Sequence, residues 1–502
     1  MRARSATLGF SSKGFLKLAD TILVAPKYKI DLKRAAVDVK RLADGNLILR
    51  SPYDLPPSKE NIGDWLRKWA AADPKRLFLA KRAQTQAQWD EITYGDALKQ
   101  VRSIAQALAS RELSPVRPVL LISKNGIDNA LLQLAAMDIG VPAIHVNPTL
   151  ALKPEQFEGF KHIIQQTTPG LVFAAEGAPF ATALKYAADQ GAEILLSSDP
   201  VAGLPSTEFG KITKSWRKGA AVKARAKNTP ETIAKVHYSG TQPSEMVGIV
   251  TTQVTMSINQ DALAVVIPQL GARPPIIVDD APWHHASGGN LIFNAALRNG
   301  GTLYIDRFGP ENQNENQNVN QKGDEGAALE TPSPSIHFTE AMPFYGLVSR
   351  LEENILLRKA FFRNLDLIWI VNGTISHEIK GRLQALAREQ TGFEIPILAS
   401  FSGVGTAAIN TALYFESDSD ANIGLPVPGT FIKLVRIGAE QDDNWGIMVN
   451  TPGLNPAIWQ NGGPIKAETD EDGYFTVYET VRLIDPMRPF KGIERQSRVT
   501  EA

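Results

Sequence analysis

The chain has 502 residues, of which 43% are hydrophobic and 21% charged, the balance of a globular protein with a core divided between subdomains. Its 53 basic and 53 acidic side chains give a formal net charge of zero. This balance excludes a strongly basic surface for nucleic acids and leaves a protein partner or homo-oligomer open. Because cysteine is absent, disulfides, cysteine-based metal centres and a thiol nucleophile are excluded.

Residues 1–23 are predicted to be an N-terminal extension outside the folded domain. The first 19 residues are basic and lack acids, which gives them a weak likeness to a transit peptide. We expect an ordinary N-terminal extension and a cytoplasmic protein. No apolar run approaches the roughly 18 residues that cross a bilayer, so no membrane association is expected.

Strand-like and helix-like segments then alternate along the chain. Short β-like runs occupy residues 24–56, and the apolar spacing of residues 61–71 predicts a helix. The next predicted strands are residues 119–123, 142–146, 170–175 and 193–198, with helices at 129–137 and 180–189. Strands and helices in this order predict an α/β fold with a parallel sheet covered by helices.

Two later segments break this alternation. Residues 310–335 are rich in Asn, Gln, Pro and acids, and they are predicted to form a mobile surface loop. From about residue 421 to residue 502, short strand-like runs are separated by Gly, Pro and Asp turns. These runs, at 431–437, 445–450 and 474–485, predict a small antiparallel or barrel-like unit.

A loop of small residues follows a strand-like run and begins with Ser239-Gly240-Thr241. Such loops cradle phosphate because backbone N–H groups in a tight turn converge on an anion. On these residues alone a plain surface turn is the more common explanation. No Lys or Arg occurs between Lys235 and Arg273, so the loop has no cation of its own for a phosphate.

A second cluster, residues 281–290, contains the adjacent histidines His284 and His285 and the pair Gly288-Gly289. Glycines allow a ligand to approach the backbone closely, and a histidine orients a carboxylate or an aromatic ring. A structural hydrogen bond is an equally good explanation for either histidine. Because adjacent histidines project in different directions, no metal site is expected here.

Together these segments resemble the acyl- and aryl-CoA synthetase branch of the adenylate-forming superfamily, and feruloyl-CoA synthases most of all. The resemblance covers residues 24–502. Its strongest matches are WAAADPKRLFLAKR (69–82), QLAAMDIGVP (133–142), TPGLVFA (168–174), TPETIAK (229–235), PWHHASGGN (282–290), NGGTLYID (299–306) and GLPVPGTFIKL (424–434). It implies the AMP-binding N-terminal domain of that fold, with two parallel βαβ subdomains and a small β-barrel-like subdomain.

The resemblance also implies a two-step reaction. A carboxylate attacks the α-phosphate of ATP, and CoA then displaces AMP, so ATP, Mg²⁺ and CoA are the implied cofactors. The implied ligand is a small-molecule carboxylate or acyl-CoA. The family's C-terminal lid domain, which supplies a lysine for the first step, would begin where this sequence ends, so the lid is expected to be absent.

The nucleotide motifs depart from the family pattern. Aligned without gaps, the family's phosphate-loop lysine falls on Val247 and its Mg²⁺-binding glutamate on Gly405. Neither residue offers a cation or a hard oxygen ligand. Remnants of the nucleotide site are expected at Ser239, Gly240, Thr241, Asn372, Gly373, Thr374, Thr406, Glu479 and Arg498.

The acyl pocket matches the family better. His285 falls on the family's histidine. The other expected pocket residues are Ser287, Gly288, Gly289 and Phe401. For Phe401, a role as a core aromatic is at least as good an explanation.

Three functions remain open, and the losses favour the first. The first is a pseudoenzyme that keeps the fold and an aryl or acyl pocket and acts as a binding, regulatory or scaffold partner. Each lost electrostatic contact costs a factor of about 100 to 1,000 in rate. The second is an active carboxylate–CoA ligase or acyl-transfer enzyme that uses a lid or partner supplied by another chain. The third is an ordinary feruloyl-CoA-synthase-like ligase.

Overall fold

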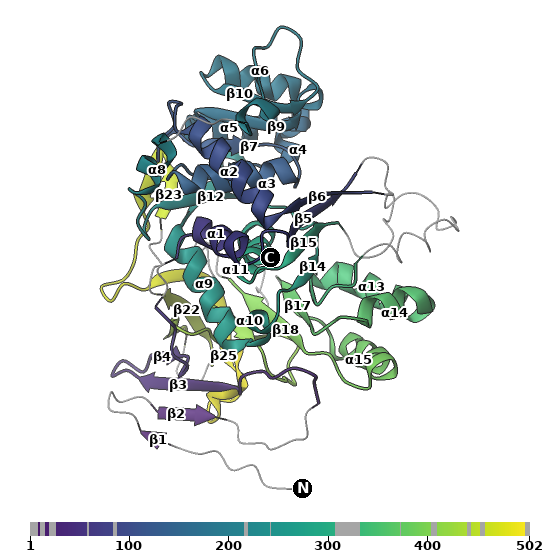
Figure 1. The fold of residues 1–502 in the computed structure, drawn as a ribbon. Helices are drawn as coiled ribbons and strands as arrows, with labels where there is room; N and C mark the ends of the chain where they lie inside the picture. The colour runs from purple at the N-terminus through teal and green to yellow at the C-terminus, as the bar shows by residue number, and fades with distance from the viewer. Residues whose placement is uncertain are drawn as a thin grey trace.

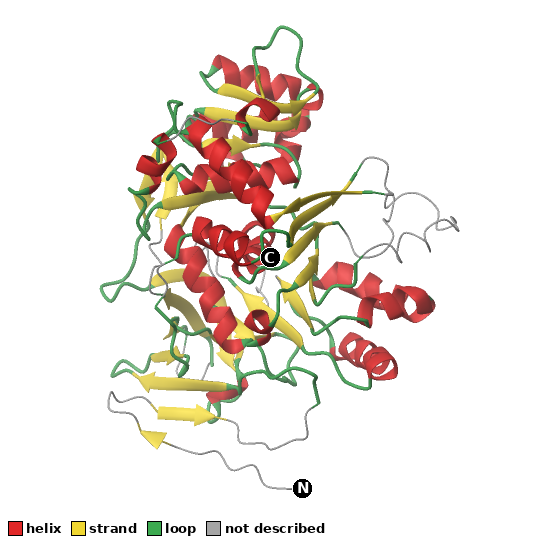
Figure 2. Ribbon diagram, in the orientation of Figure 1, coloured by secondary structure: helices red, strands yellow, loops and turns green. Residues whose placement is uncertain are grey.

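The computed structural model describes residues 9–10, 16–19, 27–57, 60–83, 88–214, 219–240, 242–306, 332–371, 373–402, 409–438, 443–451 and 457–496. Within these ranges, helices pack around two large β-sheets (Figures 1 and 2). Both sheets contain parallel strands that alternate with helices along the chain. The predicted α/β fold is therefore confirmed.

The first sheet lies in the upper part of Figure 1 and, in the part of the chain that the structure describes, has six parallel strands and three antiparallel ones. The parallel strands, in spatial order, are β11 (Thr207–Glu208), β10 (Glu193–Ser198), β9 (Leu171–Glu176), β7 (Val119–Leu121), β8 (Ala143–His145) and β12 (Ile233–Ser239). The antiparallel strands β13 (Val247–Thr252), β23 (Ala457–Gln460) and β24 (Gly463–Lys466) follow β12.

Helices cover both faces of this sheet, which explains its continuous apolar strands. Leu121 packs with α2 (Tyr94–Leu108) and α3 (Ile127–Asp138), whereas Leu120 packs with α5 (Phe157–Thr167) and α6 (Ala181–Asp189). Successive strand residues point to opposite faces, so the two leucines serve two separate cores. The short helices α4 (Pro148–Leu152), α7 (Phe209–Ile212) and α8 (Ala220–Arg225) complete this region.

Counted over the described residues, the second sheet has seventeen strands and joins a parallel half to an antiparallel half. The parallel strands are β5 (Leu77–Arg82), β15 (Thr302–Ile305), β14 (Ile276–Val278), β16 (Ile336–Thr339), β17 (Leu367–Val371) and β18 (Ile397–Phe401), with β6 (Trp89–Thr93) antiparallel at the edge. Beyond β18 follow β19 (Thr411–Leu413), β20 (Asn422–Pro426), β26 (Ile493–Arg495), β25 (Phe475–Leu483), β22 (Trp445–Asn450), β21 (Phe431–Arg436), β4 (Leu47–Arg50), β3 (Ala36–Arg41), β2 (Leu16–Ala19) and β1 (Gly9–Phe10).

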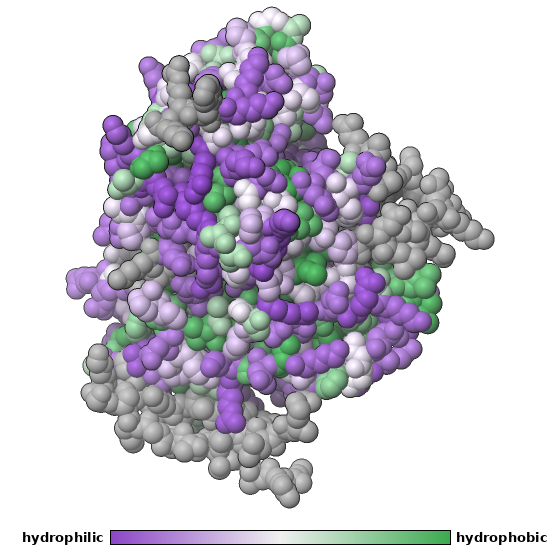
Figure 3. All heavy atoms as spheres, viewed as in Figure 1, coloured by the Kyte–Doolittle hydropathy of each residue, from purple (hydrophilic) through white to green (hydrophobic). Residues whose placement is uncertain are grey.

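The main core lies between the two sheets. Trp369 of β17 packs there in one apolar cluster with α1 (Ile62–Ala72), α9 (Gln253–Val266), α10 (Gln269–Ala272) and α11 (Phe293–Arg298). On the other face, Ile368 and Ile370 pack against α13 (Ala341–Glu353), α14 (Ile355–Phe362) and α15 (His377–Thr391). The face shown in Figure 3 is mostly hydrophilic, with hydrophobic residues in small separate groups.

Three predictions about the chain's outer segments need correction. Residues 9–10 and 16–19 of the expected extension form β1 and β2, which belong to the antiparallel sheet because β2 pairs with β3. Most of the expected surface loop 310–335, namely residues 310–331, lies outside the described residues. At its end, however, Ser333 and Ser335 are buried and not on the surface. Finally, β23 and β24 do not belong to the predicted barrel-like unit. They extend the first sheet, in which β23 pairs with β13 and Trp459 is buried.

Among the described residues, no helix combines the length and apolar character that crossing a membrane demands.

Gly424 is expected to be the most sensitive glycine of the antiparallel half. Its φ is +87°, and an added Cβ would overlap the carbonyl group of Ala412 on β19. We expect Gly424→Ala to lower the free energy of unfolding by about 3–5 kcal/mol, since left-handed strain and overpacking add. Gly45→Ala is the matched control, because Gly45 has a φ of +86° with no atom within 4 Å of the added Cβ. Urea unfolding measures both variants, and equal losses would contradict the overlap.

Candidate functional site at the ends of the parallel strands

A cavity of about 1030 Å³ lies where parallel strands of both sheets end. His145, Ser239 and Val371, the last residues of β8, β12 and β17, all line it. Ligands of α/β proteins bind in the crevice outside the carboxyl ends of parallel strands. The cavity therefore occupies the position in which this architecture places an active or binding site.

The connection between β12 and β13 forms one wall of the cavity. The two strands are antiparallel, with Ser239 opposite Val247, so the predicted phosphate loop is the turn of a hairpin. Gly240 has a φ of +118°, and an added Cβ would lie 2.6 Å from the carbonyl oxygen of Glu245. Ser239 and Gly240 line the cavity, whereas Val247 is 41% exposed and does not.

The segment around the adjacent histidines forms the opposite wall. The side chain of Asn125 holds it, accepting a hydrogen bond from the Trp283 backbone N–H (3.0 Å) and donating one to the carbonyl of Ala281 (2.9 Å). The chain then enters a π-helix, Ser287–Ile292, that continues into α11. Such wide turns are rare and occur often at functional sites. His285 and Ser287 line the cavity.

Gly288 and Gly289 are buried and face protein backbone. An added Cβ would overlap the carbonyl oxygen of Ala281 at Gly288, and that of Trp283 at Gly289. These glycines therefore allow the π-helix to pack directly on the preceding turn. Neither glycine is among the residues that line the cavity.

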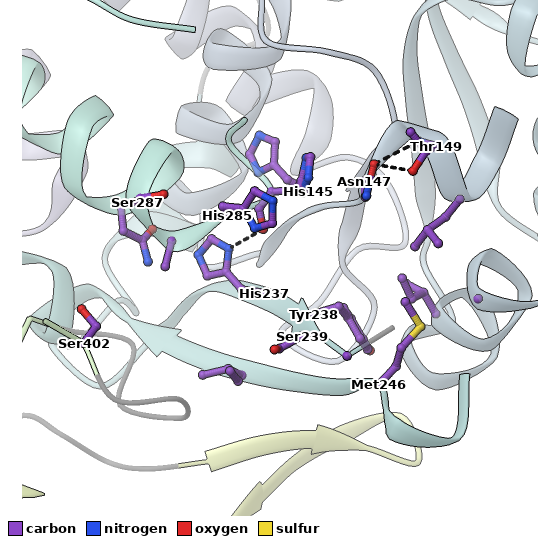
Figure 4. Close-up of a pocket in the computed structure, with 18 of the residues that line it drawn as sticks. His145, Asn147, Thr149, His237, Tyr238, Ser239, Met246, His285, Ser287 and Ser402 are labelled. Atoms are coloured by element: carbon purple, nitrogen blue, oxygen red, sulfur yellow. Dashed lines mark hydrogen bonds between the residues drawn. The ribbon is translucent and has the colours of Figure 1, made fainter. Parts of the chain in front are cut away.

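Three histidines lie close together in the wall of the cavity. Figure 4 shows His145, His237 and His285 together, between Ser287 and Ser402 on one side and Tyr238 and Met246 on the other. The rings of His284 and His285 lie 4.4 Å apart between centroids. His145 and His237 are only 4% and 6% exposed.

Burial keeps the imidazoles of His145, His237 and His284 uncharged. Burial, followed by the charge of Lys235, lowers the pKa of His237 to about 4 and that of His145 well below its usual range. Burial and the neighbouring His285 lower the pKa of His284 to about 4. At neutral pH these three side chains are therefore neutral hydrogen-bonding groups.

Lys235 lies behind the histidines and is fully buried. It is two residues before His237 on β12, and therefore on the same face of the sheet. Its Nζ donates a 2.7 Å hydrogen bond to the carbonyl of Gly289 and lies 5.7 Å from the ring centroid of Phe293. Burial lowers the pKa of Lys235 to about 7. Lys235 does not line the cavity but supports the π-helix that does.

The other expected nucleotide and pocket residues lie apart from this cavity or outside the described residues. Gly373 is exposed and Thr374 half-buried just beyond β17, and Phe401 packs against the antiparallel core while its neighbours Ser400 and Ser402 line the cavity. Both carboxylate oxygens of Glu479 accept hydrogen bonds from Arg495, at 2.9 and 2.6 Å. Thr241, Asn372, Gly405, Thr406 and Arg498 fall outside the described residues.

Sequence reasoning missed several residues of the cavity. His145 ends the apolar strand β8, and His237 lies near the end of β12. A histidine at the end of a parallel strand was the available signal. Asn259 of α9 and Asn290 of the π-helix gave no such signal, because only the fold brings them to the cavity. Among the described residues, no group of three or more His, Asp or Glu side chains is placed to hold a metal ion.

Fold and cavity together define the architecture of the adenylate-forming enzymes. Solved structures that share it include apo MatB from Rhodopseudomonas palustris (16% identity, 88% of this chain and 79% of that chain, TM-score 0.64). A luciferase-like enzyme from the nonluminescent mealworm Zophobas morio is also similar (14% identity, 90% and 99%, TM-score 0.68). A third is a benzoate CoA ligase from Burkholderia xenovorans LB400 (15% identity, 87% and 79%, TM-score 0.64).

The family described as AMP-binding enzymes matches residues 66–320, half of the chain. The protein belongs to the AMP-binding enzyme family. No curated protein sequence matches it.

Proposed function

We propose that this protein binds an aryl or acyl carboxylic acid, or a derivative of one, in the cavity and does not by itself adenylate it efficiently. The observation that carries the proposal is that no Lys or Arg is among the described residues lining the cavity. Resemblance to feruloyl-CoA synthases makes hydroxycinnamic compounds the first ligands to test.

The case against efficient adenylation is electrostatic. ATP brings several negative charges, and phosphoryl chemistry depends on cations that neutralise them at fixed positions. The residue at the family's lysine position is Val247. Lys235, which lies behind the histidines, is hydrogen-bonded to the carbonyl of Gly289. Losing one such contact costs a factor of about 100 to 1,000 in rate.

The case for an acyl ligand rests on the cavity's size and walls. Its volume of about 1030 Å³ accommodates a drug-sized molecule. Apolar side chains, including Leu150, Ile249, Leu291 and Ile409, alternate around it with hydroxyls, amides and imidazoles. An apolar body with a few polar groups is the ligand chemistry that such walls match.

ATP–pyrophosphate exchange and thermal unfolding test this function together. With a panel of aryl and fatty acids, we expect exchange at least about 1,000-fold below that of an active acid–CoA ligase. We also expect at least one acid, amide or CoA ester to raise the melting temperature. Exchange near the rate of an active ligase would overturn the proposal, as would the absence of stabilisation by every compound.

A gain-of-charge variant sharpens this test. Val247→Lys places a cation at the family's position, and we expect ATP to stabilise this variant more than the wild type. Val222→Lys is the matched control, since Val222 is 71% exposed on α8, whereas Val247 pairs with Ser239 of the cavity wall. An equal response of both variants to ATP would show that the cavity gains nothing from the lysine.

A further inference from the structure

A buried lysine lies directly behind one wall of the cavity. Lys235 of β12 is fully buried, and its Nζ donates to the carbonyl of Gly289 in the π-helix at 2.7 Å. Ser287, Asn290 and Leu291 of the same π-helix line the cavity. The π-helix therefore contacts Lys235 on one side and the cavity on another.

The strands bring Lys235 close to the cavity from a second direction. His237 follows it on the same face of β12, a rise of about 7 Å along the strand. On the neighbouring strand β8, Ala143 is the partner of Lys235, and His145 is two residues further along. Both histidines line the cavity, and burial followed by the charge of Lys235 lowers the pKa of each. The electric field of Lys235 therefore reaches the cavity wall.

Lys235 has no counter-ion among the described residues. Thr251 is its partner on β13, and the ring centroid of Phe293 on α11 lies 5.7 Å from its Nζ. Burial lowers the pKa of Lys235 to about 7, and no carboxylate opposes this effect. The protonated lysine is therefore costly in the free protein, and a negative charge nearby would offset that cost.

Imidazoles are the other titratable groups around Lys235 in the described part of the chain. They belong to β8, to β12 and to the segment before the π-helix, namely His145, His237, His284 and His285. The charged groups of α3, α9 and α11 have partners of their own, which are Asp128 with Ser197, Asp138 with Arg67, and Asp261 with Arg298. A ligand in the cavity is therefore the group that can supply the negative charge.

We infer that the cavity takes its acid as a carboxylate monoanion together with one proton, which Lys235 binds behind the histidines. The carboxylate is placed against accessible groups of the wall, the exposed imidazole of His285 and the hydroxyl of Ser287 (Figure 4). Lys235 keeps its bond to Gly289 and acts only through its charge. This inference rests on the proposed function, because it names the charge state of the ligand in the same site.

The charge balance also limits the ligand. One lysine balances one negative charge, so a monoanion matches this site and a polyphosphate does not. At an effective protein dielectric constant, two charges several ångströms apart attract each other enough to change affinity by roughly tenfold.

Titration calorimetry on the full chain measures the proton directly. Benzoate and cinnamate are titrated at pH 7.5 in two buffers with different heats of ionisation, and the difference in binding enthalpy gives the protons taken up per ligand. We expect about half a proton for each carboxylate, the uptake that a tenfold coupling to a lysine of pKa about 7 produces. Benzamide and cinnamamide, which have the same rings without the charge, are expected to take up none.

The same linkage sets the pH dependence of affinity. Above pH 7 the lysine of the free protein is mostly neutral, so a carboxylate loses its partner as the pH rises. We expect benzoate to bind about five- to tenfold more weakly at pH 9 than at pH 6.5, and benzamide to bind equally at both.

Lys235→Met identifies the group that takes up the proton. We expect this variant to bind benzoate without proton uptake and with one affinity at pH 6.5 and pH 9. Lys466→Met is the matched control, since Lys466 is exposed on β24, and it is expected to keep the uptake of the wild type. Circular dichroism establishes that both variants are folded. If Lys235→Met does not fold, the wild-type comparison of benzoate with benzamide decides.

The outcomes separate the two proposals. Carboxylate binding without proton uptake, or with uptake that persists in folded Lys235→Met, would overturn the inference and leave the proposed function standing. Binding of the amides but not of the carboxylates would do the same. If no compound binds, the proposed function fails and the inference fails with it.

Discussion

Lys235→Met is expected to stabilise the protein at pH 7 and to destabilise it at pH 10. Burial lowers the pKa of Lys235 from 10.5 to about 7 in the folded protein. Between these values the unfolded chain holds a proton that the folded one does not. Lys235 therefore makes the free energy of unfolding rise by about 1.4 kcal/mol for each pH unit between pH 7 and pH 10.5. Below pH 7, the folded protein bears the full cost of holding a buried, protonated lysine.

Methionine removes this penalty, about 4–5 kcal/mol at pH 7, but leaves the carbonyl of Gly289 without its donor, a loss of about 1–3 kcal/mol. The net gain near pH 7 is therefore about 1–4 kcal/mol, and it changes sign between about pH 8 and pH 10. Urea unfolding at pH 7, 8.5 and 10 measures the difference. Lys466→Met is the control, because Lys466 is exposed on β24. A constant difference across this range would contradict a buried, titrating lysine.

Acid is expected to destabilise the protein between pH 6.5 and pH 4, with a contribution from its buried histidines. Burial lowers the pKa of His237 and His337 to about 4 in the folded protein. As the pH falls below 6.5, these histidines therefore become protonated in the unfolded chain but stay neutral in the folded one. The stabilisation is present above pH 6.5 and lost toward pH 4. Each such histidine contributes up to about 3 kcal/mol.

Denaturant unfolding from pH 7 to pH 4.5 measures this loss. His237→Asn and His337→Asn are each expected to make the slope shallower by about 1.4 kcal/mol per pH unit between pH 6 and pH 4.5. Only the first change lies in the cavity, so only His237→Asn is expected to alter ligand binding. Slopes equal to that of the wild type would show that these residues do not control the acid response.

The parallel part of the fold could be predicted from the sequence because its signals are local. A run such as residues 193–198 is short, has an apolar centre and is bounded by turns, and β10 has those bounds. The position of β23 could not be predicted. Its sequence is compatible with any antiparallel sheet, and its place is set by the burial of Trp459, whose Nε1 donates to the carbonyl of Gln166 at 2.9 Å.

The site divides in the same way. Ser239, Gly240, His285 and Ser287 could be found from motifs, because each motif lies at the end of a strand or the start of a helix. The hydrogen-bond partner of Glu479 could not be predicted from the sequence, because Arg495 contacts Glu479 only when β25 and β26 pair. The tautomers of the histidines depend on distant amides such as Asn129, which no local pattern reveals.

The antiparallel sheet joins the two halves of the chain. β4 pairs with β21, and the Arg436 backbone N–H donates to the side chain of Asn46 across 390 residues. At a synthesis rate of about 5–20 residues per second, β4 is made roughly 20–80 seconds before β21, the strand with which it pairs. An unpaired strand edge is a template for aggregation, so the nascent chain depends on chaperones or on the Lys and Arg side chains of these strands to remain soluble.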